Sequence, residues 1–303
     1  MSGISTNRTD INLPSEVSTA IIQKVQEESA VMRLAEQMPL PGLGATIPII
    51  TSDPEAQWVT TETNRKPVSN PGLSSKLMQG YTLAVIVPFS NQFRRDAATL
   101  FDALVARLPR ALGYKFDLTC FGAADKPGEN FDNLAACTAQ SLIASGSHTP
   151  YKGLVNARID IANHNGKLDA FALSPAAVGI LLESTDTTGR PIFIQNTSDA
   201  GFDRLLGARS IETRGAYKAG SAAADSSAGV PAIVGAAGDW TQARWGTVEG
   251  VKVSFADQAT LTINSQQVNL WERNMFAVRA EIEVGFRCDT SCFNLLTGAT
   301  PQA

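Results

Sequence analysis

The chain has 303 residues, of which 44% are hydrophobic and 18% are charged, a balance typical of ordered globular proteins. Its length allows one large core or two smaller ones, because domains usually hold roughly 100 to 200 residues. The formal net charge of -4 argues against tight nucleic-acid binding, which needs clustered lysine and arginine.

Signals for targeting, disulfides and metals are sparse. No segment has the roughly 20 predominantly apolar residues of a membrane span, and the N-terminus lacks the apolar core of a secretory signal. We therefore expect cytoplasmic synthesis and no membrane partner. Cys288 and Cys292 form a CxxxC pair, but a zinc site needs two further ligands, and the only histidines are His148 and His164. Because the chain has only four cysteines, we expect no disulfide, and likewise no metal or cofactor.

The first fifty residues combine a polar arm, a helix and an edge strand. Residues 1–14 are polar and predict a flexible arm, and the apolar spacing that follows predicts a helix over 15–38. The apolar positions of that helix are Val17, Ile21, Val25, Met32 and Ala35. Residues 46–50 predict a strand that Pro48 confines to a sheet edge.

Residues 51–80 differ in composition from the rest of the chain. They contain three prolines, many hydroxyl side chains and few large apolar groups, so they cannot form a core of their own. A loop of about 30 residues without its own function is unusual in a compact domain. Because the segment lies between two strand-like runs, it predicts an extended, hairpin-like excursion.

A strand and a long helix follow this excursion. Residues 81–87 alternate and predict a strand that Pro88 ends. Apolar positions over 94–118 define one face of a long helix, and Pro109 should bend it because proline removes a backbone donor.

The next segment predicts a helix, a strand and a second helix. The first helix is expected at 151–162 and a short buried strand at 171–173. Ser174 is a good N-cap, and Pro175 occupies the first position of the helix that continues over 176–183. This succession indicates a mixed α and β domain.

The last third contains the clearest strand. The composition of residues 214–238, mostly Gly, Ala and Ser, favours a surface loop over small-residue packing inside a domain. Residues 251–255 and 260–264 are strand-like. Over 276–288, apolar and charged side chains alternate, which predicts one long antiparallel strand with a buried face. The charged positions are Arg279, Glu281, Glu283 and Arg287.

Motifs of the common enzyme classes are absent. The chain has no GxxxxGK[ST], GxSxG, HExxH or GxGxxG. Two histidines leave few chances for a Ser-His-Asp arrangement, and His164, in NHNGK, is typical of a solvated turn. A carboxylate pair stays open, although no spacing points to one. We therefore do not expect an enzyme that acts on a free small molecule.

Short motifs in a particular order carry a family resemblance. EAQWVTTE, RKPVSN and GYTLAVIVPFSNQFRRDA are followed by GENFDNL, by FALSPAAVGILLESTDTTGRPIF, and by GDWTQARWGTVEGVKVSFADQA with NLWERNMFAVRAEIEVGFRC. In this order they resemble the tailed-phage major capsid proteins with the Hong Kong 97 fold, which encapsulin shells share. The first three motifs are similar to the family's protruding E-loop, its returning strand and the start of its long spine helix.

The resemblance implies an α+β, Hong Kong 97-like capsid fold and a domain division. The parts expected are an N-terminal arm and helix (1–50), an E-loop (51–80), a peripheral domain with the spine helix (81–150), an axial domain (151–265), and the peripheral return strand with the C-terminus (266–303). It implies a virion shell subunit, assembled in the host cytoplasm. Pentamers and hexamers would form an icosahedral head around packaged double-stranded DNA.

Further partners are implied in the same way. They are a portal protein, in some members a decoration protein, and a separate scaffolding protein, since family-like sequence begins close to Met1. Polar extended segments are costly to order in a monomer, but across a neighbour they bury area and pair their backbones. We therefore expect residues 1–14 and 51–80 to lie over sister molecules.

Some family members join subunits by an isopeptide bond between a lysine and an asparagine. In this sequence Lys66 matches the lysine position, Asn274 the asparagine and Glu281 the glutamate that promotes proton transfer. Lys66 would have to lose its proton despite a reference pKa of about 10.4, through desolvation and a nearby carboxylate. The other interpretation is a solvated loop lysine, a turn asparagine and a glutamate on the polar face of the last strand.

Two other functions stay open. An encapsulin shell would share the fold and enclose a cargo protein, although the Gly, Ala and Ser region and the long arm favour a phage subunit. A soluble α+β enzyme with an unrecognised site is the alternative from a different class.

Overall fold

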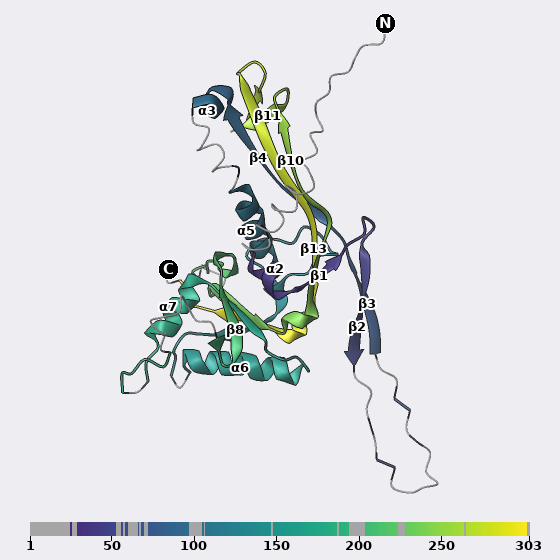
Figure 1. Ribbon diagram of the computed structural model, residues 1–303. Coiled ribbons are helices and arrows are strands. Elements are labelled where there is room, and N and C mark those ends of the chain that lie inside the picture. The colour runs from purple at the N-terminus through teal and green to yellow at the C-terminus, as the bar shows by residue number, and fades with distance from the viewer. Residues whose placement is uncertain are drawn as a thin grey trace.

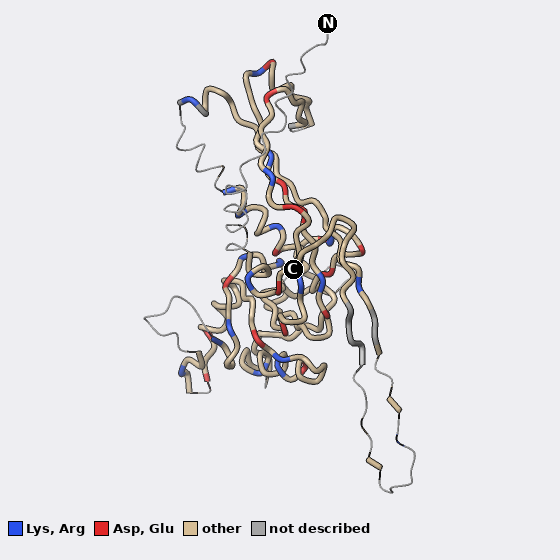
Figure 2. Tube along the Cα trace, turned by 45° about the vertical axis from the view of Figure 1, so that its right-hand side comes forward, with Lys and Arg blue, Asp and Glu red and all other residues tan. Residues whose placement is uncertain are grey.

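The computed structural model describes residues 25, 29–52, 56, 58–59, 66, 68–69, 72–96, 105, 107–146, 148–186, 188–193, 204–223, 228–263 and 265–301. A four-stranded sheet and a six-stranded sheet form two bodies along an elongated molecule, and a narrow hairpin leaves from its side (Figure 1). Basic and acidic residues are interspersed over both bodies (Figure 2). No described helix is long and apolar enough to cross a membrane.

The four-stranded sheet has the order β1-β10-β13-β4. Its strands are β1 (Glu36–Pro39), β10 (Ala243–Ala256), β13 (Met275–Cys288) and β4 (Tyr81–Ser90). β13 pairs antiparallel with β10 and with β4, and β1 pairs parallel with β10. The alternation predicted for the last long strand is confirmed, because Val278, Ala280 and Ile282 are buried while Arg279 is exposed.

β4 continues through Pro88, so the prediction that Pro88 ends this strand is wrong. Pro88 faces Ala277 in the register with β13. Because β4 is an edge strand, a residue without a backbone N–H can stand there without leaving a neighbouring carbonyl unpaired. Beyond this strand lies α3 (Asn91–Asp96), at the same end of the sheet as the hairpin of β11 (Thr260–Ile263) and β12 (Gln266–Asn269) (Figure 1).

The single helix predicted over 15–38 is wrong in two places: Ser29 interrupts it with an extended backbone (ψ 121°), and it ends before residue 36. α2 spans Ala30–Leu34, and residues 36–39 form β1 instead. Parallel pairing with β10 provides residues 36–39 with backbone partners that a further helical turn would not use. The first 24 residues lie outside the described part of the chain, and they include the polar N-terminal segment predicted over 1–14.

A buried carboxylate holds α2 against α5 (Leu108–Cys120). Asp117 accepts hydrogen bonds from Ser29 Oγ at 2.6 Å, Ala30 N at 2.9 Å, Val31 N at 3.2 Å and Thr213 Oγ1 at 3.3 Å. Burial raises the pKa of Asp117 to about 6, although all four donors act to lower it. The carboxylate thus joins three segments that are distant in the sequence.

The long helix predicted over 94–118 is broken close to Pro109, because residue 105 is helical and α5 begins only at Leu108. Residue 107 lies in a turn, and Pro109 stands in the first turn of α5, where a backbone N–H would have no helical partner. Residues 97–104 of the predicted helix lie outside the described residues.

Aromatic side chains fill the core between α5 and the four-stranded sheet. Phe116 of α5 lies edge-on to both Phe131 and Phe286, with ring centroids 6.2 and 6.3 Å apart. The rings of Phe131 and Phe286 are 6.0 Å apart, and all three side chains are buried. Such contacts add to the stabilisation from burial alone, so this cluster fixes the helix on the sheet.

The six-stranded sheet has the order β5-β14-β9-β6-β8-β7. Its strands are β5 (Thr138–Ser141), β14 (Phe293–Thr297), β9 (Ile233–Gly238), β6 (Ala170–Leu173), β8 (Ala208–Glu212) and β7 (Arg204–Leu205). The helices α6 (Pro150–Asn163) and α7 (Pro175–Glu183) confirm two predicted helices, and Ser174 Oγ caps α7 by accepting from Ala177 N. Short 3-10 turns connect these elements: η1 (Leu134–Ala136), η2 (Arg214–Ala216), η3 (Trp240–Gln242) and η4 (Thr290–Cys292).

The Gly, Ala and Ser segment does not stay on the surface throughout, so the preference for a loop over 214–238 is wrong at its end. Residues 233–238 form β9, an interior strand of the sheet, and Ala236 and Ala237 are fully buried. Small side chains are needed there: a Cβ on Gly238 would lie 2.1 Å from the Phe293 ring. Small residues in this stretch allow close approach between neighbouring elements.

The two sheets exchange segments across the expected domain limits. β10, from the 151–265 segment, lies in the four-stranded sheet, whereas β5 and β14, from the 81–150 and 266–303 segments, lie in the six-stranded sheet. β9 joins two of these segments within the six-stranded sheet: it pairs with β14 from the 266–303 segment on one side and with β6 from the 151–265 segment on the other. The bodies are therefore built from interleaved segments.

Candidate functional site

The hairpin that leaves the body is formed by β2 (Ala45–Ser52) and β3 (Gly72–Met78), which pair only with each other (Figure 1). This confirms the strand predicted at 46–50 and its edge position, since a two-stranded sheet has only edges. We call residues 45–78 the arm. Trp58 is 99% exposed and Val68 is 82% exposed, so these apolar side chains have no cover from their own chain. Large apolar groups exposed in this way mark interaction surfaces.

An ionic cluster fixes the base of the arm to the end of β13. Arg287 donates from Nη1 to Asp132 Oδ1 at 2.7 Å and from Nε to Leu77 O at 2.8 Å. Lys76 Nζ lies 3.3 Å from Asp132 Oδ2 and donates to Cys288 O at 3.1 Å. Arg287, predicted on a polar face, is only 9% exposed, because the base of the arm and residues 130–132 cover it.

A pair of glycines makes room for the base of the arm. Gly246 of β10 and Gly285 of β13 face each other in the register, and Met78 lies against both. A Cβ on Gly285 would lie 2.7 Å from Gln79 O, and one on Gly246 would lie 2.7 Å from Met38 O. The sheet therefore has a gap where the chain of the arm crosses it, a feature that no sequence pattern indicated.

The predicted cross-linking residues are not brought together within one subunit. Lys66 lies exposed in the arm, between β2 and β3. Asn274 lies in the exposed turn before β13 with a φ of 53°, and its Oδ1 accepts from Asn91 Nδ2 at 2.9 Å. The hairpin of β2 and β3 and this end of the four-stranded sheet point to opposite ends of the molecule (Figure 1).

Glu281 is also separate from Asn274. It lies half-buried within β13, where it stands opposite Lys252 and Ala84, and its Oε1 is 3.3 Å from Arg279 Nη2. Six strand residues rise about 20 Å, at roughly 3.3 Å each, between the start of β13 and Glu281. A site containing all three predicted residues must therefore combine different copies of the chain.

Both histidines lie beside backbone carbonyl groups, and burial affects the two cysteines of the CxxxC pair. His148 Nε2 lies 2.8 Å from Ser141 O, and His164 Nδ1 lies 2.9 Å from Asp160 O. Burial raises the pKa of both Cys288 and Cys292. Within the described ranges, no three His, Cys, Asp or Glu side chains are grouped in a way that could hold a metal ion.

A family model and two curated relatives all relate this chain to phage capsid proteins. The family model described as "Phage capsid family" matches residues 10–289. A protein named "Probable major capsid protein gp17" from Mycobacterium phage L5 is 29% identical over 300 residues, covering 94% of this chain and 89% of that protein. Its namesake from Mycobacterium phage D29 is 26% identical over 292 residues, with the same coverage of 94% and 89%.

Solved structures share the fold over 90% of the chain or more. A chain from Mycobacterium phage Adephagia has a TM-score of 0.71 at 19% identity and covers 100% of this chain and 96% of its own. A chain from Gordonia phage Cozz has a TM-score of 0.70 at 17% identity, with coverage of 90% and 87%. The capsid of an empty GTA particle has a TM-score of 0.62 at 12% identity, with coverage of 99% and 96%. At these identities the likeness concerns the fold.

Proposed function

The chain belongs to the phage capsid family, and from this premise we propose that it is the major capsid protein of a tailed phage. It is a structural protein of the virion that assembles with copies of itself. Its α+β fold, expected to be of the Hong Kong 97 type, is confirmed by the mixed helices and strands and by the likeness to phage structures. The comparisons do not favour an encapsulin or a soluble enzyme.

Assembly through the arm is supported by the exposure of Trp58 and Val68, apolar side chains that their own subunit does not bury. Fully burying a large apolar side chain contributes about 1.5 to 3 kcal/mol. In a closed shell each copy both extends an arm and receives one, so this contribution recurs around the shell. We infer that the arm lies over a neighbouring subunit, in pentamers and hexamers of an icosahedral head around packaged double-stranded DNA. Scaffolding, portal and decoration proteins remain proposed partners from the family resemblance.

Electron microscopy of the double variant Trp58→Ser and Val68→Ser tests the role of the arm. We expect folded subunits that no longer form closed shells, whereas Val230→Ser, which removes a 57% exposed side chain outside the arm, should assemble normally. Closed shells of the double variant at the wild-type yield would disprove the role of these side chains. Shells of the wild-type chain that carried protein cargo in place of nucleic acid would instead indicate an encapsulin.

We also propose that assembled subunits form an isopeptide bond between Lys66 and Asn274. The neutral Nζ of Lys66 attacks the side-chain amide carbon of Asn274 in another copy, a C–N bond forms and ammonia leaves. Glu281 of a further copy accepts the proton that the attacking amine loses and returns it to the amide nitrogen of Asn274, which leaves as ammonia. The proposal is supported by the match of all three residues to the family positions and by the exposure of Lys66 and Asn274.

Denaturing gels of assembled particles test this bond. Covalent oligomers should appear as a ladder in the wild type and in Lys126→Ala, a matched exposed lysine, and should be absent from Lys66→Ala. A single monomer band from wild-type particles would refute cross-linking while leaving the shell function intact.

A further inference from the structure

Three arginines from separate elements line one pocket beside the six-stranded sheet. Arg33 comes from α2, Arg204 from β7 and Arg209 from β8, and the cavity has a volume of about 410 Å³. Ser210, Ile211 and Glu212 complete the lining. All three arginines are exposed.

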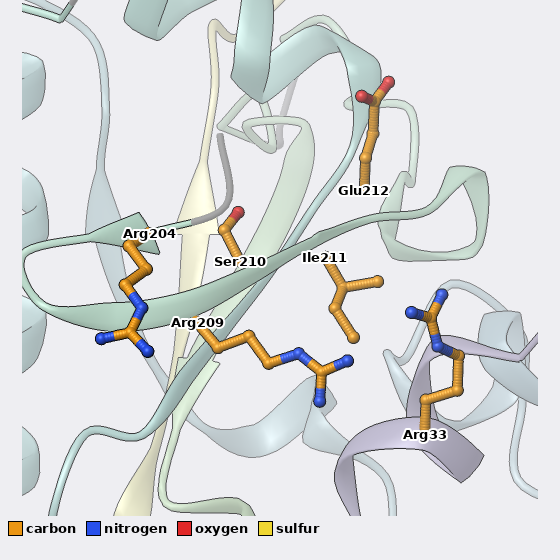
Figure 3. A pocket seen from close by; sticks show the side chains of 6 residues that line it. All are labelled: Arg33, Arg204, Arg209, Ser210, Ile211 and Glu212. Carbon is orange, nitrogen blue, oxygen red and sulfur yellow. The ribbon is translucent and has the colours of Figure 1, made fainter. Parts of the chain in front are cut away.

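Two of these arginines form a like-charged pair across an edge of the sheet. Arg204 and Arg209 stand directly opposite each other in the antiparallel register of β7 and β8. Like charges in this position destabilise a sheet, because cross-strand Cβ atoms are only about 4.5 to 5.5 Å apart. Beyond this pair the two side chains extend in different directions, so each guanidinium group stays open to an anion (Figure 3).

The third arginine adds charge from another direction. Arg33 lies in the last turn of α2, a helix whose start is fixed by Asp117. Figure 3 shows Arg209 and Ile211 extending from β8 on the side of Arg33, whereas Ser210 and Glu212 extend to the opposite side. The carboxylate in the lining therefore points away from the space between Arg33 and Arg209.

The guanidinium groups have no carboxylate partner among the described residues. By contrast, Arg244 pairs with Glu36, Arg279 with Glu281 and Arg287 with Asp132. Positive charge is thus concentrated in this pocket, although the whole chain has a net charge of -4. Such an arrangement attracts an anion.

The geometry favours a phosphate over a carboxylate. One arginine can bind both oxygens of a planar carboxylate with two parallel hydrogen bonds. A phosphate has more acceptor oxygens, arranged tetrahedrally, and can accept from guanidinium groups that converge from several directions. Arg33 from α2 and Arg209 from β8 lie on the same side of β8 and provide two such directions (Figure 3), and Arg204 adds positive charge to the lining.

We propose that this pocket binds a phosphate group, from free inorganic phosphate or from the backbone of DNA. The bound phosphate lies between Arg209 of β8 and Arg33 of α2, with Arg204 adding positive charge nearby, so it also ties α2 to the sheet edge. The DNA source rests on the proposed function, in which the shell encloses a genome. Binding of free phosphate does not depend on that function.

Binding is measured on unassembled wild-type protein, because a closed shell restricts access to one of its faces. The probes are radiolabelled inorganic phosphate in equilibrium dialysis, short duplex DNA in fluorescence anisotropy over a salt series, and polyglutamate as a carboxylate polymer. The variants are Arg204→Gln with Arg209→Gln, and Arg33→Gln alone. Arg190→Gln, an exposed arginine outside the pocket, is the matched control.

We expect the double variant to bind phosphate at least about tenfold more weakly. If DNA is the source, the slope of log affinity against log salt should also fall by about 1 for each arginine removed. Added phosphate should raise the melting temperature of the wild type and of Arg190→Gln but not that of the double variant. Without phosphate, the double variant should melt higher than the wild type, since the repulsion is gone.

Equal phosphate affinity in the wild type and the double variant would overturn the proposal. Arginine-dependent binding of polyglutamate alone would also overturn it, and would indicate an acidic protein segment as the occupant. Electron microscopy of the same preparations separates this result from shell assembly. Wild-type protein that forms shells but binds neither phosphate nor DNA refutes the pocket and leaves the capsid function standing.

Discussion

Replacing Asp117 by asparagine should remove a pH dependence of folding that the wild-type chain possesses. The pKa of this carboxyl rises from 3.8 to about 6 in the folded protein, mainly through burial. A difference of that size corresponds to about 3 kcal/mol between the two protonation states. Because the group is almost fully buried, solvent screening reduces this value little.

The sign of the effect follows from proton linkage. The folded chain holds the proton on Asp117 more tightly than the unfolded chain does, so folding is favoured when the group is protonated. This contribution is fully present below a pH of about 3.8 and is lost as the pH rises through about 6. Asparagine resembles the protonated acid and does not titrate. The stability of the wild type relative to Asp117→Asn should therefore fall by about 3 kcal/mol between about pH 4 and pH 7.

Urea unfolding of unassembled protein, followed by tryptophan fluorescence, measures this difference. Trp240 and Trp245 are both buried and should report the loss of the core. Comparing the two proteins at each pH cancels the titration of all other carboxylates. The same pH dependence in the wild type and in Asp117→Asn would refute the assignment to Asp117.

A second substitution separates charge from hydrogen bonding. Asp117→Ala leaves the buried N–H groups of Ala30 and Val31 without their acceptor. An unsatisfied buried donor costs about 1 to 3 kcal/mol. The alanine variant should therefore be less stable than the asparagine variant at every pH. Equal stabilities of the two variants would show that α2 does not depend on these bonds.

Three further substitutions test other parts of the structure. Ser174→Ala removes the N-cap of α7 and should lower the free energy of unfolding by about 1 kcal/mol in urea titrations; no change would mean that the cap contributes nothing. Asp132→Asn leaves Arg287 without its buried ion pair, so we expect a loss of about 2 kcal/mol and faster proteolysis within the arm, whereas an unchanged cleavage rate would contradict the anchoring role. Gly122→Ala introduces a side chain at a φ of 77°, 2.7 Å from Ala135 Cβ, and should lower the melting temperature, which calorimetry measures.

Local patterns in the sequence were enough to predict several elements. The strand over 276–288 was recognisable because alternating burial requires alternating side chains. The start of α7 was recognisable because Ser174 and Pro175 act on the nearest helical turn. The hairpin-like excursion over 51–80 was predicted because these residues have too few apolar groups to form a core. Each of these depends on neighbours along the chain.

The errors at residues 36–39, 233–238 and Arg287 have a common cause in contacts between distant segments. Residues 36–39 form a strand because β10 offers a parallel edge, and residues 233–238 are buried because β6 and β14 flank them. The pairing of Arg287 with Asp132 spans 155 residues of sequence. All of these partners are far apart in the sequence, whereas hydrophobic periodicity reflects only neighbours within a few residues. It therefore could not predict these contacts.

For the candidate sites, the sequence by itself determined which residues are chemically able to act, and the tertiary structure decided which of them meet. Lys66, Asn274 and Glu281 match the lysine, asparagine and glutamate positions of the family in sequence, but the fold keeps them apart within one subunit. Arg33, Arg204 and Arg209 carried no motif, yet the fold brings them to one pocket. The physical reason is that composition and spacing act over a few residues, whereas strand register and helix docking set distances between remote side chains.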